Sequence, residues 1–249
     1  MKENLVSIIT PMYNSEKFIT KTIDSVLNQT YKEWEMIIVD DCSKDSSPEI
    51  VKEYAKKDSR IRYIELKVNK GVSNARNVAI ENANGQYIAF LDSDDIWDKD
   101  KLQKQIEFMK KENHILTFTA YELIDENNNK LNKVINVPES VDYKTLLKGN
   151  IIGCLTVVID RSKLDFDIRM SGINHEDYVL WLSILKKGYK AYGLNEVSAL
   201  YRKSSTSLSG NKIKSAKWTW NIYRNVENIP IHKSVYYFIN YAINGIRKS

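Results

Sequence analysis

Short apolar runs alternate with segments of helical spacing between residues 5 and 95, and this alternation constrains the fold more than any other feature. The runs, rich in valine and isoleucine, are Leu5–Ile9, Met36–Val39, Ile61–Leu66 and Tyr87–Leu91. The segments between them, around residues 18–27, 47–55 and 72–83, repeat apolar side chains every three or four residues, as helices do. Strands that are apolar on both faces are typical of a parallel sheet covered by helices on both sides. The sequence therefore predicts an α/β fold built on a mostly parallel sheet.

Polar clusters follow three of these strands at the point where each apolar run stops. They are Thr10–Tyr13, Asp40–Asp41 and Asp92–Asp95. In a parallel sheet the carboxyl ends of the strands meet at one edge, and ligands bind there. We therefore expect the three clusters to converge on one site.

The pattern of elements changes after Asp95. The expected elements there are a helix over 100–111, a half-buried strand over 115–121, a hairpin turn over 125–130, a strand over 155–159 and a helix over 174–187. We expect residues 1–205 to form one domain, with a nucleotide-binding half in 1–97 and an acceptor-facing half in 98–205. Residues 206–249 then form a basic, aromatic helical tail.

The net charge of +5 is concentrated in this tail. From Asn211 onward seven lysines and arginines stand against one acid, Glu227, which gives +6 and leaves −1 for the rest of the chain. A basic segment that also carries Trp218, Trp220 and several tyrosines suits an anionic membrane surface, or packing on the main domain or on a second subunit, as in a homodimer. A nucleic-acid partner is not expected, because the body of the chain is not basic.

Neither a secretion signal nor a membrane span is expected. The first apolar run is short and is interrupted by Ser7 and Pro11, and no stretch reaches the ~20 apolar residues of a membrane-spanning helix. Cys42 and Cys154 lie far apart and form no CxxC pair, so neither a zinc site nor a disulfide is predicted. We therefore expect a cytoplasmic protein, with the tail as a means of binding the inner face of the plasma membrane.

Three carboxylates, those of Asp92, Asp94 and Asp95, stand together at the end of one strand. Such a cluster is costly to bury unless a cation is present. A small number of hard oxygen ligands suits Mg²⁺ or Mn²⁺ shared with the phosphates of a substrate. We assign this role to Asp92 and Asp94, and we expect Asp95 to cap the following helix.

Several short motifs occur in a fixed order along residues 5–205. They are Val6–Asn14, Gln29–Tyr31, Ile37–Ser43, Asn69–Gly71, Ala75–Asn77, Gly85–Asp95 and His175–Tyr178 with Trp181. In order and spacing they resemble family 2 of the inverting nucleotide-sugar glycosyltransferases, of the kind that builds bacterial surface polysaccharides. The resemblance implies the GT-A fold, a Rossmann-like central, mostly parallel sheet flanked by helices, here with a C-terminal helical extension.

The resemblance also implies a binding site for a nucleotide-diphospho-sugar donor, a UDP-sugar. Carried over by position, Pro11 and Tyr13 line the base, Asp41 with Asp40 accepts a hydrogen bond from uracil, and Arg76 reaches the base or the phosphates. Asp92 holds the ribose, Asp94 ligates Mn²⁺ or Mg²⁺ at the diphosphate, and Asn69, Ser93 and Arg202 complete the donor site. A fixed divalent ion stabilises the negative charge that develops on the departing diphosphate.

Transfer needs a base as well, because a sugar hydroxyl is a poor nucleophile. Glu176 and Asp177, at the start of a predicted helix, supply two carboxylates, and the resemblance assigns the base to Asp177. Glu176 either orients the acceptor, a role also given to Trp181, or favours the helix N-terminus electrostatically. One displacement with one base inverts the anomeric centre, whereas two carboxylates flanking the bond would suggest a glycosidase.

One position departs from the family pattern. Many relatives carry a histidine two residues after the pair that corresponds to Tyr201 and Arg202, where this chain has Ser204. The resemblance implies transfer of a sugar to a glycan or lipid-linked acceptor, with a catalytically weak, sugar-nucleotide-binding partner subunit as an alternative. A nucleotidyltransferase is the other alternative, although residues 10–15 lack the glycine-rich loop that such enzymes use.

Overall fold

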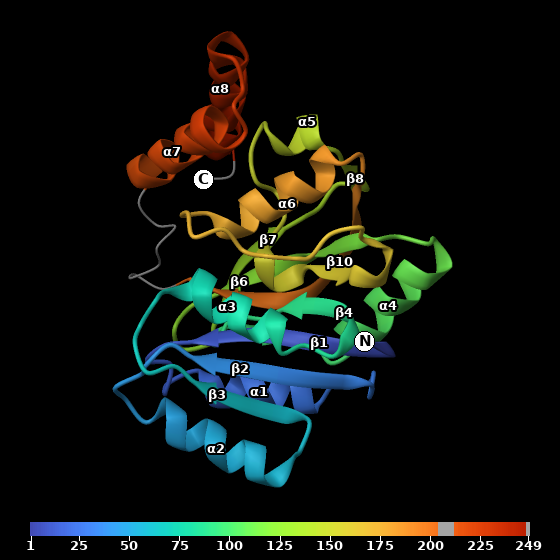
Figure 1. The fold of residues 1–249 in the computed structure, drawn as a ribbon, viewed down its shortest axis with the longest axis vertical. Coiled ribbons are helices and arrows are strands. Elements are labelled where there is room, and N and C mark those ends of the chain that lie inside the picture. The colour runs from blue at the N-terminus through green and yellow to red at the C-terminus, as the bar shows by residue number, and fades with distance from the viewer. Residues whose placement is uncertain (204–211, 248–249) are drawn as a thin grey trace.

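The computed structural model describes residues 1–203 and 212–247, and within them ten strands form one continuous sheet (Figure 1). The strand order is β3-β2-β1-β4-β9-β6-β10-β5, with β7 beside β6 and β8 beside β10. The strands are β1 (Lys2–Met12), β2 (Trp34–Asp40), β3 (Ile61–Glu65), β4 (Gly85–Phe90), β5 (Ile96–Trp97), β6 (Leu116–Ile124), β7 (Lys130–Ile135), β8 (Ser140–Val141), β9 (Val158–Asp160) and β10 (Ala191–Arg202). The helices are α1 (Ile19–Leu27), α2 (Ser47–Lys57), α3 (Val72–Glu81), α4 (Lys101–Lys111), α5 (Tyr143–Leu146), α6 (Glu176–Lys186), α7 (Lys212–Asn221) and α8 (Ile231–Arg247).

The first four strands pair in parallel, as the apolar runs predicted. Strand β1 lies between β2 and β4, so that Ile8 is opposite Met36 on one side and Ala89 on the other. Strand β3 pairs with the far side of β2. The α/β fold with a parallel half is confirmed.

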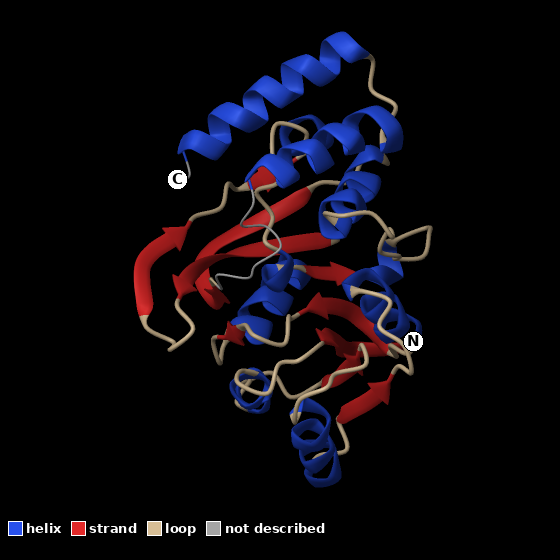
Figure 2. Ribbon diagram, turned by 90° about the vertical axis from the view of Figure 1, so that its left-hand side faces the viewer, coloured by secondary structure: helices blue, strands red, loops and turns tan. Residues whose placement is uncertain are grey.

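Successive residues of the central strands point to opposite faces of the sheet, and each face has its own helices. Ile8 belongs to a core that α1, α2 and α4 cover, whereas Ile9 belongs to a core formed with α3 and α6. Both side chains are fully buried. Helices therefore cover both faces of the sheet, which explains why its strands read as unbroken apolar runs (Figure 2).

The second half of the sheet mixes strand directions. Strand β9 is antiparallel to both β4 and β6, β10 is parallel to β6, and β6 forms an antiparallel hairpin with β7. The predicted turn over 125–130 is thus confirmed. The strand expected over 155–159 is shorter and later, since a 3-10 turn occupies Cys154–Thr156 before β9 begins at Val158.

The tail packs against the body of the molecule. A π-helical segment, η4 (Ile222–Val226), joins α7 to the turn before α8 and buries Ile222 and Tyr223 completely. The Tyr223 hydroxyl donates a hydrogen bond to the Leu147 carbonyl oxygen at 2.5 Å. Trp220 packs edge-on against Phe238 with ring centroids 5.4 Å apart. Among the described residues, no helix is long and apolar enough to cross a membrane.

Candidate active site

The carboxyl ends of β1, β2 and β4 meet at one edge of the sheet and line a cavity of about 410 Å³, which we call the donor cavity. Its lining includes Pro11, Tyr13, Asp41, Asn69, Asp92, Ser93 and Asp94. Tyr13 is 49% exposed there, so its ring is available to a flat ligand. The predicted convergence of the strand-end clusters is confirmed.

Two neighbouring aspartates at the end of β2 have different surroundings. The Asp41 carboxylate accepts hydrogen bonds from the backbone N–H groups of Lys70 and Gly71, at 2.9 and 2.7 Å, and so shapes the loop beside the cavity. The Asp40 carboxylate accepts from the Ser43 N–H and the Tyr63 hydroxyl and is 1% exposed. The assignment of Asp40 to the base is therefore corrected: this side chain fixes the end of β2 and does not line the donor cavity.

Arg76 joins the two halves of the site. Its guanidinium lies 2.6 Å from the Asp92 carboxylate and 2.5 Å from that of Glu176, and the residue is 4% exposed. Burial acts against the charged form, but the neighbouring carboxylates, Asp92 foremost, raise the pKa of Arg76. Arg76 lines a second cavity, described below, and not the donor cavity, so its assignment to the base or the phosphates stays a prediction. Arg76 also neutralises two acids and links α3 to the start of α6.

Asp94 and Asp95 differ although they are adjacent. Burial, followed by the charge of Asp92, raises the pKa of Asp94 to about 6, and the charges of Arg202 and Arg76 oppose this rise. Asp95 is 1% exposed, and its Oδ1 accepts a hydrogen bond from the Arg202 N–H at 2.8 Å. Helix α4 begins only at Lys101, so the prediction that Asp95 caps this helix is wrong. Asp95 thus connects the acidic loop, residues 92–95, to β10.

The Arg202 side chain holds the same loop from the other side. Its Nε donates to the Asp94 carbonyl oxygen and its Nη1 to that of Asp125, both at 2.7 Å, while Nη2 donates to Asn128 Oδ1 at 2.9 Å. The guanidinium also lies 4.5 Å from the Phe18 ring. With every nitrogen engaged and 2% exposure, Arg202 positions the loop and does not reach a diphosphate, which corrects that assignment. Ser204 lies outside the described residues.

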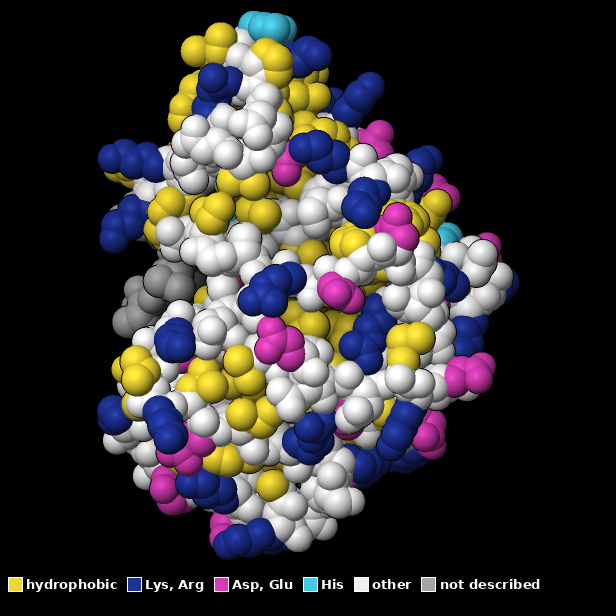
Figure 3. All heavy atoms as spheres, in the orientation of Figure 1, with side chains coloured by type: hydrophobic (Ala, Val, Ile, Leu, Met, Phe, Trp, Pro, Cys, Tyr) yellow, Lys and Arg dark blue, Asp and Glu magenta, His cyan; other side chains and the backbone are white. Residues whose placement is uncertain are grey.

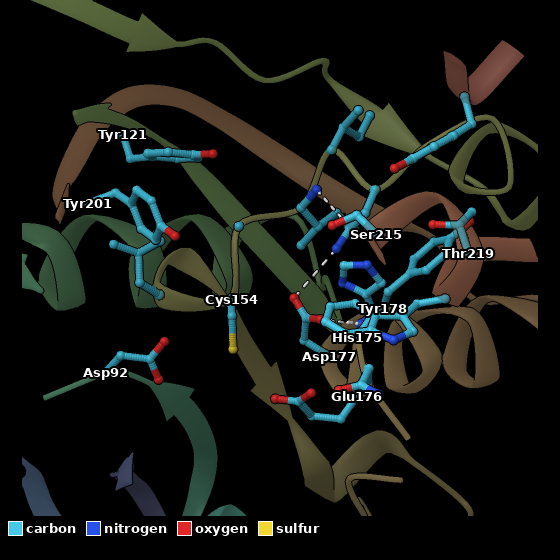
Figure 4. A pocket seen from close by; sticks show the side chains of 18 of the residues that line it. Asp92, Tyr121, Cys154, His175, Glu176, Asp177, Tyr178, Tyr201, Ser215 and Thr219 are labelled. Carbon is cyan, nitrogen blue, oxygen red and sulfur yellow. Dashed lines mark hydrogen bonds between the residues drawn. The ribbon is translucent and has the colours of Figure 1, made fainter. Parts of the chain in front are cut away.

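A second cavity of about 470 Å³, which we call the acceptor cavity, opens around Asp177 at the N-terminus of α6 (Figure 4). The Asp177 carboxylate accepts from the Tyr178 N–H at 2.7 Å and from the Asn150 amide at 3.4 Å. Burial raises the pKa of Asp177, and the charge of Arg76 opposes this. Asp92 lines both cavities, so they meet at its carboxylate.

Aromatic side chains that sequence reasoning missed form much of the acceptor cavity's wall. Tyr121 and Tyr201 pack with ring centroids 5.9 Å apart, and Trp218 of the tail packs edge-on against His175 at 5.3 Å. Tyr241 of α8 also lines the cavity. The sequence carried a weak signal for the tail residues, the aromatic composition after residue 211, but nothing that placed them beside Asp177.

Cys154 points into the space between Asp92 and Asp177, as Figure 4 shows. Burial raises the pKa of its thiol well above the ordinary value, so it is protonated at neutral pH. The thiol therefore acts as a small apolar part of the wall.

Trp181 lies in the core and not in either cavity. It is fully buried, and its ring packs edge-on against Phe90 with centroids 5.6 Å apart. Its assignment to acceptor binding is corrected, because a side chain without exposed surface cannot touch an acceptor. Glu176 does line the acceptor cavity, and burial raises the pKa of its carboxyl.

The acidic loop fits a divalent cation that is shared with a substrate. Within residues 1–203 and 212–247, no group of three or more His, Cys, Asp or Glu side chains is arranged to hold a metal ion by itself. The Asp94 carboxylate lies at the donor cavity, and its pKa stays raised although the charges of Arg202 and Arg76 favour the ionised form, which indicates unfavourable negative charge. A cation that takes further ligands from a diphosphate and water suits such a sparse site.

Comparisons with known sequences agree with this arrangement. The sequence model described as "Glycosyl transferase family 2" matches residues 7–164. A Bacillus subtilis protein described as a putative teichuronic acid biosynthesis glycosyltransferase, TuaG, is 49% identical over 98% of this chain and 97% of its own length. The Escherichia coli UDP-Glc:alpha-D-GlcNAc-diphosphoundecaprenol beta-1,3-glucosyltransferase WfgD is 42% identical over 100% of this chain and 96% of its own length.

A solved structure supports the fold. The mannosyltransferase PcManGT from Pyrobaculum calidifontis, in complex with GDP-Man and Mn²⁺, superposes with a TM-score of 0.70 at 18% identity. The superposition covers 90% of this chain and 64% of that one, so this chain spans less than two thirds of the solved protein. The likeness supports the GT-A fold.

Proposed function

This chain belongs to glycosyl transferase family 2, and on that premise we propose that it transfers a sugar from a UDP-sugar to a lipid-linked glycan with inversion at the anomeric carbon. The WfgD relative is named for UDP-glucose and a sugar attached to diphosphoundecaprenol, and the TuaG relative for teichuronic acid biosynthesis. We propose that this chain acts in the same kind of process, the synthesis of a cell-surface polysaccharide at the cytoplasmic face of a bacterial plasma membrane.

The donor cavity suits a nucleotide diphosphate. Tyr13 offers an exposed ring for stacking on the base, and Asp41 retains unused acceptor capacity for uracil beside the loop at Asn69. Asp92, which is partly exposed, is positioned by Arg76 to accept from ribose hydroxyls. Asp94 would hold Mn²⁺ or Mg²⁺, and when bound this ion would stabilise charge on the departing diphosphate.

The acceptor cavity suits the attacking hydroxyl. We assign Asp177 as the base, since its carboxylate lies in the cavity and burial raises its pKa, which makes it a stronger proton acceptor than an exposed aspartate. The acceptor oxygen forms a bond to the anomeric carbon, the bond from that carbon to the diphosphate breaks, and Asp177 takes the hydroxyl proton. A single displacement of this kind inverts the anomeric configuration.

One observation carries the proposal most directly: the donor and acceptor cavities meet at Asp92. A donor bound on one side of this carboxylate would present its sugar to the other side, where Asp177 lies. The aromatic wall of Tyr121, Tyr201 and Trp218 is the kind of surface that packs against sugar rings.

The proposal is tested by measuring UDP release and product formation with a panel of UDP-sugars and a polyprenyl-diphosphate sugar as acceptor. We expect Asp177→Asn to reduce transfer by about 10²- to 10⁴-fold while donor binding persists. Asp94→Ala and excess chelator should both weaken donor binding. Asp165→Asn, which changes an exposed aspartate that pairs with Lys187 at 3.3 Å, is the matched control. Undiminished transfer by Asp177→Asn would remove the base assignment, and donor binding without transfer to any lipid-linked acceptor would favour a non-catalytic partner subunit.

A further inference from the structure

Helix α8 carries a stripe of exposed apolar side chains along one face. Ile231, Val235, Ile239 and Ile243 recur every fourth residue and are 63, 44, 54 and 44% exposed, and Tyr236 beside them is 53% exposed. The described residues contain twelve exposed large hydrophobic side chains, and these five stand on this single helix. Exposed apolar surface that is gathered in this way marks an interaction site.

The opposite face of α8 packs against the body of the protein. Detachment of the helix is therefore not the reason why the stripe is exposed. Ser234 is fully buried, and Tyr237 and Phe238 pack against the core that includes α6. The Asn244 amide donates to the Lys148 carbonyl oxygen at 3.0 Å. Helix α8 therefore packs on the body through one face, and the exposed fractions of its apolar stripe place the stripe on the solvent side. Figure 2 shows α8 lying at one end of the molecule.

The charge around the stripe indicates what covers it. Lys212, Lys214, Lys217 and Lys233 are exposed on α7 and α8, and Figure 3 shows basic and hydrophobic side chains together at this end of the molecule. The acid of this segment, Glu227, has a side chain only 5% exposed and is neutralised by Lys186 at 2.9 Å. A symmetric dimer would bring two such basic segments together, whereas an anionic bilayer attracts them.

We propose that the outward stripe of α8 lies in the surface of an anionic lipid bilayer, with α8 parallel to the membrane plane. A helix of 17 residues that combines isoleucine and tyrosine on one face with nearby lysines is typical of an interfacial helix. In this position the exposed Lys233 of α8 would extend its charged end to lipid phosphates while its carbon chain stays against apolar surface.

This orientation, which rests on the proposed function, gives the acceptor cavity a fixed height above the membrane. Tyr241 lies on the inner side of α8 and lines that cavity. A helix with its side chains is about 10 Å across, so a cavity on the inner side of α8 would lie within about one helix diameter of the bilayer surface. A sugar attached through a diphosphate to a membrane lipid is held close to the same surface. The tail thus selects acceptors that are presented from a membrane.

Vesicle flotation tests the surface independently of catalysis. The probes are vesicles of phosphatidylcholine alone and vesicles with added phosphatidylglycerol. We expect the full chain to float with the anionic vesicles, to release them at high salt, and to bind at least about tenfold less in the double variant Ile239→Asp/Ile243→Asp. Leu131→Asp, a 43% exposed leucine on β7, is the matched control and should bind as the unmodified chain does. Thermal unfolding checks that each variant is folded.

The outcomes distinguish binding of a membrane from binding of a second copy of the chain. Undiminished vesicle binding by the double variant would overturn the proposal, as would a dimer in sedimentation velocity that this variant converts to a monomer. The double variant should retain transfer to a water-soluble acceptor with a short lipid chain and lose it to the same acceptor embedded in vesicles. If the unmodified chain transferred sugar to neither acceptor, the proposed function would be rejected. The flotation result would still test membrane binding by α8.

Discussion

Replacing Lys101 with methionine is expected to stabilise the protein at neutral pH. Lys101 is fully buried at the start of α4, where its Nζ lies 2.7 Å from Gln105 Oε1 and 4.3 Å from the centre of the Trp97 ring, and no carboxylate pairs with it in the described chain. Burial alone lowers the pKa of Lys101 from 10.5 to about 7. The folded state must therefore neutralise a lysine that the unfolded state keeps charged.

The magnitude follows from this shift. At about 1.4 kcal/mol per pH unit, the cost of the lysine at pH 7 is roughly 4 kcal/mol. Methionine removes this cost but leaves Gln105 Oε1 without its donor, a loss of about 1–3 kcal/mol. We expect a net gain in the free energy of unfolding of about 1–3 kcal/mol at pH 7.

The pH dependence gives the more specific signature. Between pH 7 and 10.5 the unfolded state binds a proton at this lysine that the folded state does not, so the stability of the unmodified protein rises with pH. The advantage of Lys101→Met should accordingly shrink by about 2 kcal/mol between pH 7 and pH 9. Urea unfolding followed by circular dichroism at both pH values measures it, with the exposed Lys110→Met on the same helix as control. An advantage that does not change with pH, or a less stable variant at pH 7, would refute the reasoning.

Three further substitutions test individual contacts. Arg76→Gln should destabilise the protein by about 3–5 kcal/mol at neutral pH, because Asp92 and Glu176 lose their buried partner. The loss should shrink as pH falls and Glu176, whose pKa burial raises, becomes protonated; urea unfolding across pH measures it, and a loss independent of pH would contradict the pairing. Trp181→Ala should lower the free energy of unfolding by about 3–5 kcal/mol in the same assay. Unchanged stability together with weaker acceptor binding would contradict the place of Trp181 in the core. Gly85→Ala should cost about 1–3 kcal/mol, because the added Cβ would lie 2.4 Å from a backbone oxygen of β1, and a thermal midpoint equal to that of the unmodified chain would count against this close approach.

Local patterns were sufficient for much of the fold. The apolar run at 36–39 lies within β2, the run at 87–91 overlaps the end of β4, and the segments at 47–55 and 72–83 correspond closely to α2 and α3. These predictions succeeded because periodicity and turn residues act over short stretches of chain. They failed for Asp95, whose position after a strand looks like a helix cap. Its actual partner, the backbone of Arg202, lies on a strand 107 residues away.

The sequence alone determined the family, the α/β architecture and the convergence of Tyr13, Asp41 and Asp92 on one edge of the sheet, because strand ends in a parallel sheet are placed by topology. Only the tertiary structure decided how charges are shared: Arg76 and Arg202, both predicted to bind the donor, are occupied by acidic and carbonyl groups. It also placed Trp218 and Tyr241 of the tail beside Asp177. Contacts of this kind join residues that are far apart in sequence, and packing of whole elements sets them, so no local pattern records them.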